Sequence, residues 1–246
     1  MPCFWYFSSY ILTRSQTKIL MNKDVLDAIK DGINKAPQKV TLVAVTKSVG
    51  IEETNEVIKA GVSAIGENRV EDFERKFPQL LPIEKHFIGQ IQSRKIKRIV
   101  ELFDVIQSVS SIEYLKKIDA EALAQVKPTK VLLQFNISGE VRKGGFKQDE
   151  LGNNSLPANS RELIGMNQTI STTHHIKIIG VMGMATNTED GETVRKQFRR
   201  LKDIRDQLRA RFPEIIELSM GMSNDYKIAL EEGATMLRIG RALFFK

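Results

Sequence analysis

The sequence predicts an α/β protein whose strands close into a single (β/α)8 TIM barrel. Short apolar, β-branched strands alternate with helical patterns from residue 39 onward, and their number, eight, favours closure. The first strand is nearly continuous in apolar character, as parallel strands covered on both faces are. An open doubly wound sheet is the alternative fold. It is disfavoured because the first strand-to-helix turn, residues 46–50, contains no GxGxxG pattern.

The N-terminal residues differ from the rest of the chain. Residues 1–20 contain no acidic residue and are rich in Ser, Thr and aromatic side chains. We expect an N-terminal extension there, either disordered or upstream of a real start at Met21. An organellar transit peptide has a similar composition and is the less favoured interpretation. The barrel is expected over residues 21–246, beginning with a helical pattern of Val25, Ile29 and Ile33.

The predicted elements then follow in a regular order. The strands are Val40–Thr46, Ala64–Gly66, His86–Gly89, Val105–Val109, Val131–Asn136, Ile176–Met182, Ile215–Met220 and Met236–Ile239. The helices between them are Ile51–Ala60, Val70–Phe77, Ile96–Leu102, Ile112–Ala124, Gly191–Arg211 and Asp225–Glu232. Asn187 or Thr188 is expected to cap the longest helix, and Gly61 and Gly233 to end two others. Residues 151–173 are polar and rich in helix breakers, which predicts an irregular excursion outside the barrel.

The composition argues against several classes of protein. The net charge is +7, but the basic clusters, residues 94–98 and 195–211, fall within helical patterns without interleaved aromatics, so we expect no nucleic-acid partner. No apolar run approaches the ~20 residues of a membrane span. The three histidines have no zinc-ligand spacing, so no metal site is expected. The single cysteine, Cys3, fits a reducing compartment, and we expect the cytoplasm.

The candidate site lies where the strands of such a barrel end. Lys47 closes the first strand, where an amine is expected to lose hydration, which lowers its pKa and allows a Schiff base. Ser223 is a natural N-cap after the seventh strand, and Gly240 and Arg241 follow the eighth, which predicts a phosphate site. The first and eighth strands are neighbours in a closed barrel, so pyridoxal phosphate (PLP), a phosphate-bearing aldehyde, is the candidate cofactor. A snorkelling lysine and an ordinary capped helix are the alternatives.

Five blocks of the sequence resemble the pyridoxal phosphate homeostasis protein family. They are residues 42–47 (LVAVTK), 66–70 (GENRV), 86–95 (HFIGQIQSRK), 218–225 (LSMGMSND) and 237–244 (LRIGRALF). The resemblance covers Met21 to Phe244, with the blocks in order and at suitable spacing. It implies a barrel of the alanine racemase N-terminal type, with PLP bound as an imine on Lys47.

The resemblance also implies roles for the remaining site residues. Arg238 would face the pyridine nitrogen of the cofactor, and Asn68 would lie beside the ring. The phosphate would be held by four residues: Met222, Ser223, Gly240 and Arg241. The family commonly has a small hydroxyl residue where this chain has Arg241, so that contact departs from the family pattern.

Two functions from different classes remain open: a non-catalytic PLP carrier and a PLP-dependent amino-acid racemase. Arg238 can only donate hydrogen bonds, which disfavours a protonated ring nitrogen and weakens carbanion stabilisation. The resembled racemases take a second acid–base group from an additional domain, whereas this chain ends with the eighth strand. We therefore expect a monomeric carrier that serves PLP homeostasis, with PLP-dependent apoenzymes as recipients. A lyase or aldolase that uses Lys47 without a cofactor is disfavoured by the five blocks.

Overall fold

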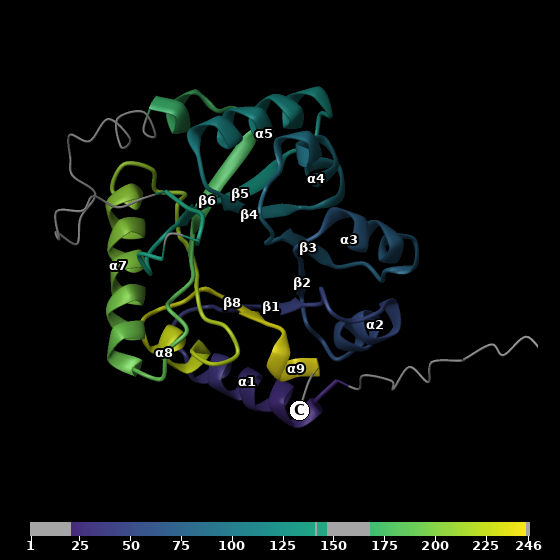
Figure 1. Ribbon diagram of the computed structural model, residues 1–246, viewed down its shortest axis with the longest axis vertical. Coiled ribbons are helices and arrows are strands. Elements are labelled where there is room, and N and C mark those ends of the chain that lie inside the picture. The colour runs from purple at the N-terminus through teal and green to yellow at the C-terminus, as the bar shows by residue number, and fades with distance from the viewer. Residues whose placement is uncertain (1–20, 141, 147–167, 245–246) are drawn as a thin grey trace, which may run out of the picture.

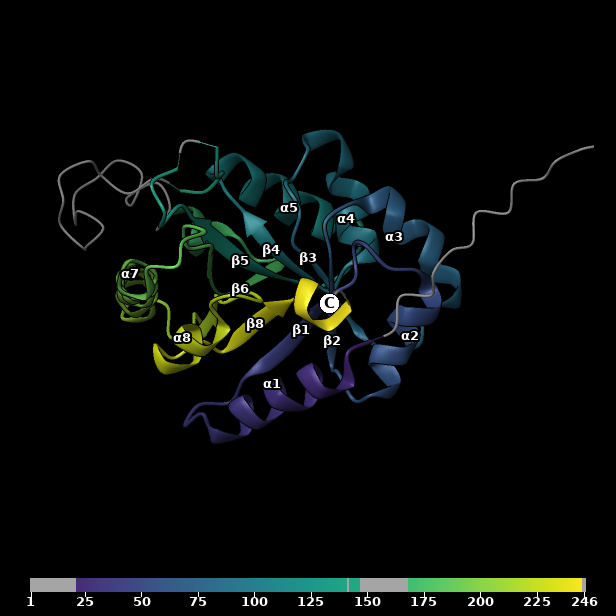
Figure 2. The ribbon, with the colours of Figure 1, turned by 60° about the horizontal axis from the view of Figure 1, so that its bottom comes forward.

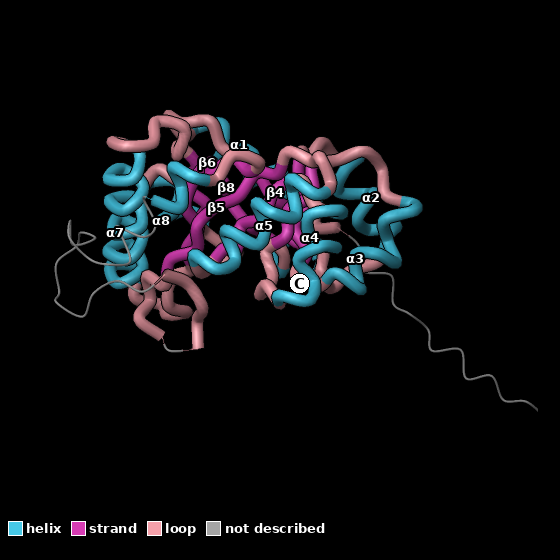
Figure 3. Tube along the Cα trace, turned by 90° about the horizontal axis from the view of Figure 1, so that it is seen from above, coloured by secondary structure: helices cyan, strands magenta, loops and turns pink. Residues whose placement is uncertain are grey.

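Eight parallel strands pair in chain order into a closed barrel, and the last strand pairs with the first. The computed structural model describes residues 21–140, 142–146 and 168–244. Its strands are β1 (Thr41–Val45), β2 (Ala64–Glu67), β3 (Glu84–Phe87), β4 (Val105–Val109), β5 (Thr129–Phe135), β6 (Ile176–Gly183), β7 (Glu217–Ser219) and β8 (Met236–Ile239). Figures 1 and 3 show helices around the strands. The predicted (β/α)8 barrel is confirmed, and the open sheet is excluded.

The helices lie close to the predicted ranges. In the described part of the chain they are α1 (Lys23–Lys35), α2 (Ile51–Lys59), α3 (Val70–Lys76), α4 (Ile96–Leu102), α5 (Ile112–Ala124), α7 (Gly191–Arg209), α8 (Tyr226–Glu231) and α9 (Arg241–Phe244). Two short 3-10 helices, η1 (Phe77–Gln79) and η2 (Ser93–Lys95), follow α3 and precede α4. Figure 2 shows α9 at one end of the barrel, where the chain leaves β8.

The helix ends test the predicted caps. Asp190 caps α7, since its Oδ1 accepts from the amide of Glu192 at 3.0 Å. The predicted caps, Asn187 and Thr188, are wrong, because the Thr188 hydroxyl accepts instead from the amide of Asp190 at 3.1 Å. Gly61 and Gly233 have φ angles of 85° and 92° after α2 and α8, so these two predicted helix ends are confirmed.

Alternating side chains divide the apolar interior into two parts. Leu42 and Ala44 of β1 belong to the large core between the strands and the helices. A smaller cluster fills the lumen of the barrel, formed by Val105, Leu132, Met182 and Met236. Because side chains two residues apart share a face of a strand, Arg238 faces the lumen like Met236. This places a charged residue among the apolar groups at the centre of the barrel.

Some predictions concern residues that the structure does not describe. The N-terminal extension, residues 1–20, and most of the excursion at 151–173 lie outside the described ranges, although residues 168–172 are helical. Within those ranges, no helix has both the length and the apolar character needed to cross a membrane. The same residues contain no group of three or more His, Cys, Asp or Glu side chains placed to hold a metal ion.

Candidate functional site

The barrel brings the carboxyl ends of β1, β2 and β8 together at one rim. β1 pairs with β2 on one side and with β8 on the other, so Lys47, Asn68 and Gly240 follow neighbouring strands. The backbone segments after β1 and β8 approach closely there. A Cβ on Gly240 would lie 3.0 Å from the Cβ of Val45 and 3.1 Å from its carbonyl oxygen. The predicted neighbourhood of the first and eighth strands is confirmed, and a side chain at position 240 would press on Val45.

Lys47 lies in an exposed turn just after β1. The prediction that this lysine loses its hydration is wrong. The strand ends at Val45, and after the buried Thr46 the chain turns so that the Lys47 side chain remains in solvent. Lys47 is therefore accessible to molecules that approach the rim from outside.

A buried ion pair holds the residue before Lys47. Oε1 of Glu67 accepts from the Thr46 hydroxyl at 2.8 Å and from Nζ of Lys76 at 2.7 Å. The same Nζ donates to the Thr46 carbonyl oxygen at 2.7 Å. The Glu67 side chain is 0% exposed and that of Lys76 is 12% exposed. The end of β1 is thus fixed from the side that faces α3, an arrangement that we did not predict from the sequence.

Arg238 is 5% exposed and lies opposite Val43 in the β1–β8 pair. Its Nη1 donates to Oγ of Ser219 at 2.6 Å, and its Nη2 donates to the Gly183 carbonyl at 2.9 Å. Burial lowers the pKa of the guanidinium to about 10, and the charge of Asp225 opposes this shift. Arg238 is therefore still a cation at neutral pH, held by neutral acceptors.

Polar side chains continue from Arg238 across the lumen. Ser219 Oγ donates to Oε1 of Gln107 at 2.6 Å, and Nε2 of Gln107 lies 2.6 Å from Nδ1 of His86. Nε2 of His86 lies 3.0 Å from Oε2 of Glu84. Sequence analysis did not single out Gln107 or His86 as site residues. For Gln107 the available signal was a polar residue inside the largely buried strand β4, whereas His86 follows two charged residues in β3 and carried no such signal.

The loop after β7 differs from the prediction. Asp225, not Ser223, stands at the N-cap of α8, and its Oδ1 accepts from the Met222 amide at 2.5 Å. Ser223 Oγ accepts instead from the amide of Ala242 at 3.1 Å. This bond ties the loop to the start of α9, where Arg241 is exposed. The predicted phosphate residues on the two loops are therefore neighbours, although Ser223 does not cap a helix.

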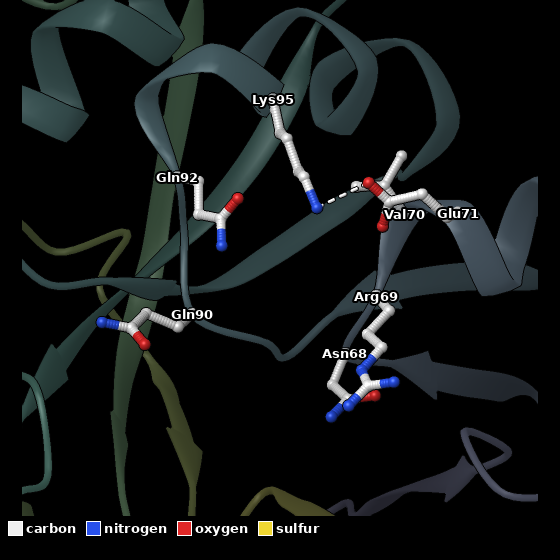
Figure 4. A pocket seen from close by; sticks show the side chains of 7 residues that line it. All are labelled: Asn68, Arg69, Val70, Glu71, Gln90, Gln92 and Lys95. Carbon is white, nitrogen blue, oxygen red and sulfur yellow. Dashed lines mark ion pairs between the residues drawn. The ribbon is translucent and has the colours of Figure 1, made fainter.

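A polar cavity of about 380 Å³ lies beside Asn68 at the ends of β2 and β3. Figure 4 shows its lining residues: Asn68, Arg69, Val70, Glu71, Gln90, Gln92 and Lys95. Nζ of Lys95 pairs with Oε1 of Glu71 at 2.5 Å, and this contact lowers the pKa of the Glu71 carboxyl. The cavity extends the site on the side of the rim away from β8.

Comparisons with known proteins agree with the fold. The alanine racemase N-terminal domain family matches residues 25–246. The pyridoxal phosphate homeostasis protein of Vibrio alginolyticus is 35% identical over 216 residues, which are 85% of this chain and 88% of that protein. The structure of PipY from Synechococcus elongatus with PLP bound has a TM-score of 0.76 at 27% identity, covering 90% of this chain and 98% of PipY.

A more distant likeness concerns the fold alone. Alanine racemase of Clostridium difficile is 16% identical with a TM-score of 0.70, and the match covers 90% of this chain and 56% of the racemase. The relationship to the homeostasis proteins is much closer, because it combines a higher identity with coverage of most of both chains. The chain therefore belongs to the pyridoxal phosphate homeostasis protein family.

Proposed function

We propose that this protein binds PLP at the carboxyl end of the barrel, holds it covalently through Lys47, and maintains its supply without catalysing a reaction. Its relatives are named pyridoxal phosphate homeostasis proteins, and PipY is described with PLP bound. One observation carries the proposal. The β1–β8 pair sets the buried cation Arg238 opposite the strand that leads to Lys47, with Gly240 beside it.

The loops after β7 and β8 fit a phosphate group. Ser223 Oγ accepts from the Ala242 amide and keeps its own hydrogen to donate. Gly240 offers its backbone without a side chain, and Arg241 adds a positive charge nearby. For Met222 to donate as well, Asp225 has to release the Met222 amide. Burial raises the pKa of the Asp225 carboxyl, which makes a neutral, more weakly accepting form more accessible.

The exposure of Lys47 supports reversible attachment. When bound, PLP would supply an aldehyde carbon with which the amine of Lys47 could condense, with loss of one water. The deprotonated Nζ of Lys47 is the proposed nucleophile. Because this side chain is exposed, water would reach such a bond and could reverse it. We propose that this reversal releases the cofactor to PLP-dependent apoenzymes.

Arg238 and the rim residues support a carrier rather than a racemase. A cationic donor beside the ring nitrogen disfavours protonation there, which weakens the cofactor as an electron sink. A racemase also needs a second acid–base group, and three of the side chains that follow the strands, Asn68, Gln90 and Asn136, are amides that cannot supply it. Tyr226, the tyrosine next to the loop after β7, is not placed to supply this group, because it lines a groove with residues of α1 on the outside of the barrel.

Trapping the attachment site tests this proposal. The purified protein is mixed with PLP, its visible absorbance is recorded, and borohydride reduction is followed by peptide mapping. We expect the modified peptide to contain Lys47, and both absorbance and adduct to disappear in Lys47→Ala. Lys59→Ala, at an exposed position on α2, is the matched control. An adduct on another residue, or none, overturns the covalent attachment.

Amino-acid turnover separates the carrier from the racemase. We expect no α-proton exchange above background when the loaded protein is incubated with amino acids in deuterated water. Turnover at an ordinary enzyme rate of ~1 per second or more, lost in Lys47→Ala, would favour the racemase.

A further inference from the structure

A continuous chain of hydrogen bonds crosses the barrel lumen from Arg238 to Glu84. We propose that Ser219, Gln107 and His86 are positioning residues that hold the Arg238 guanidinium, through hydrogen bonds that all run in one direction. This inference rests on the proposed function only for what Arg238 does to a bound cofactor. The hydrogen bonds themselves join only side chains of this protein.

The direction is set at the Arg238 end. A guanidinium can only donate, so Ser219 Oγ accepts from Nη1 at 2.6 Å. The single hydroxyl hydrogen of Ser219 is then donated to Oε1 of Gln107 at 2.6 Å. The side-chain amide of Gln107 therefore has its oxygen toward Ser219 and its NH2 group toward His86.

The same direction continues to Glu84. The NH2 group of Gln107 can only donate, and it lies 2.6 Å from Nδ1 of His86, so Nδ1 carries a lone pair. The ring proton of the neutral imidazole is then on Nε2, which lies 3.0 Å from Oε2 of Glu84. Glu84 suits the role of last acceptor, because its hydrogen bonds with His86 and then Lys130 lower its pKa to about 2.

Because its members are buried, the hydrogen-bond chain has a single arrangement in which each of them is satisfied. His86, Gln107 and Ser219 are each 0% exposed. If Gln107 turned over, its NH2 group would face Ser219 and its oxygen would face the lone pair of His86. The Ser219 hydrogen would then lack its acceptor at a fully buried position, which is costly. We infer that this arrangement fixes the guanidinium before any cofactor arrives.

The first test uses the protein without PLP. Nitrogen NMR of labelled histidine is expected to show His86 as the neutral tautomer with its proton on Nε2. Hydrogen exchange of the Arg238 guanidinium is expected to be at least tenfold faster in Ser219→Ala and in Gln107→Met. Gln107→Glu, which keeps an acceptor for Ser219, should restore slow exchange. Met182→Leu changes the same lumen without removing any of these hydrogen-bond partners and is the matched control.

The second test uses PLP. In Ser219→Ala the dissociation constant is expected to rise by up to about tenfold, because the Arg238 side chain then has to be ordered when the cofactor binds. The absorbance band is expected to move as the environment of the ring nitrogen changes. The band and the dissociation constant of Gln107→Glu should be closer to those of the unmodified protein than the values of Gln107→Met.

The outcomes separate this inference from the proposed function. A proton on Nδ1 of His86 overturns the inference that the hydrogen bonds run in one direction and hold Arg238. Unchanged hydrogen exchange of Arg238 in Ser219→Ala and Gln107→Met also overturns it, whether or not PLP binds. Absence of PLP binding by the unmodified protein overturns the proposed function and leaves the NMR result valid. If a variant does not fold, the tautomer of His86 in the unmodified protein still decides the direction.

Discussion

Two networks hold the two ends of the proposed cofactor site, and they use different chemistry. At the end of β1, the ion pair of Glu67 and Lys76 holds Thr46 from the side of the strand that faces α3. At β8, hydrogen bonds to neutral acceptors hold Arg238 from inside the lumen. The first network leaves the next residue, Lys47, in solvent, whereas the second buries the residue that it holds.

This difference suggests a division of labour within one site. A buried ion pair is strongly coupled, so losing one partner leaves an uncompensated charge. A chain of neutral groups carries less charge and mainly determines orientation. We therefore expect the β1 network to dominate the stability of the rim and the lumen chain to dominate the alignment of Arg238. The site would then recognise the cofactor with a fixed group and attach it through an accessible one.

Removing the carboxylate of the β1 network should have the largest effect. Glu67→Ala leaves the Lys76 cation without its opposite charge and the Thr46 hydroxyl without its acceptor, so we expect the free energy of unfolding to fall by about 3–5 kcal/mol. Chemical denaturation measures this loss. Covalent PLP attachment, followed by absorbance, should also slow, because the turn that carries Lys47 is no longer held.

Glu67→Gln separates the effect of the charge from that of the hydrogen bond. It keeps an oxygen for Thr46 but removes the charge, so an intermediate loss is expected. If Glu67→Ala unfolds like the unmodified protein, the ion pair does not hold the rim and the division of labour is wrong.

Acid should lower the free energy of unfolding through Glu84, at the far end of the hydrogen-bond chain in the lumen. The loss should be smaller than that in Glu67→Ala. The folded pKa of Glu84 is about 2, below its ordinary value of 4.5, so its ionised form stabilises the fold. This contribution is fully present above pH 4.5 and is lost as the pH falls towards 2. Because the side chain is 34% exposed, solvent screening reduces it to about 1–2 kcal/mol.

Denaturation at several pH values measures this effect. Glu84→Gln should make the free energy of unfolding less dependent on pH between about 4.5 and 2. Unfolding curves that keep the same pH dependence in Glu84→Gln would contradict the role of Glu84 as last acceptor.

The sequence predicted the barrel well because its signals are local. The apolar runs of Val105–Val109 and Met236–Ile239 agree with β4 and β8 to the residue. The two networks were missed because their partners are distant in the chain. Ser219 and Gln107 are 112 positions apart, and Thr46 and Glu67 are 21 apart. Only closure of the barrel brings them together, and no local pattern encodes which polar side chain meets which.

The exposure of Lys47 was missed for a related reason. An apolar run predicts that a strand is buried, but not how the chain turns after its last paired residue. Similarly, Ser223 has the chemistry of an N-cap, yet Asp225 takes that place and the Ser223 hydroxyl accepts from the Ala242 amide in the first turn of α9. Residue type predicted the capacity to bind, while tertiary structure selected the partner.

Removing the charge of Arg241 should have the smallest effect of these changes, a small rise in the PLP dissociation constant. It tests the exposed rim of the site rather than the buried lumen. Arg241 is exposed at the start of α9, so its attraction for a phosphate is screened by solvent and worth about 0.2–1 kcal/mol. In Arg241→Ala the PLP dissociation constant should therefore rise by less than about fivefold. The difference from the unmodified protein should shrink as salt is added. Arg209→Ala removes an exposed charge at the end of α7 and should change neither quantity. A tenfold or greater loss of affinity that salt does not reduce would mean that Arg241 is drawn into a buried contact when the cofactor binds, and the rim would then be as firmly organised as the lumen.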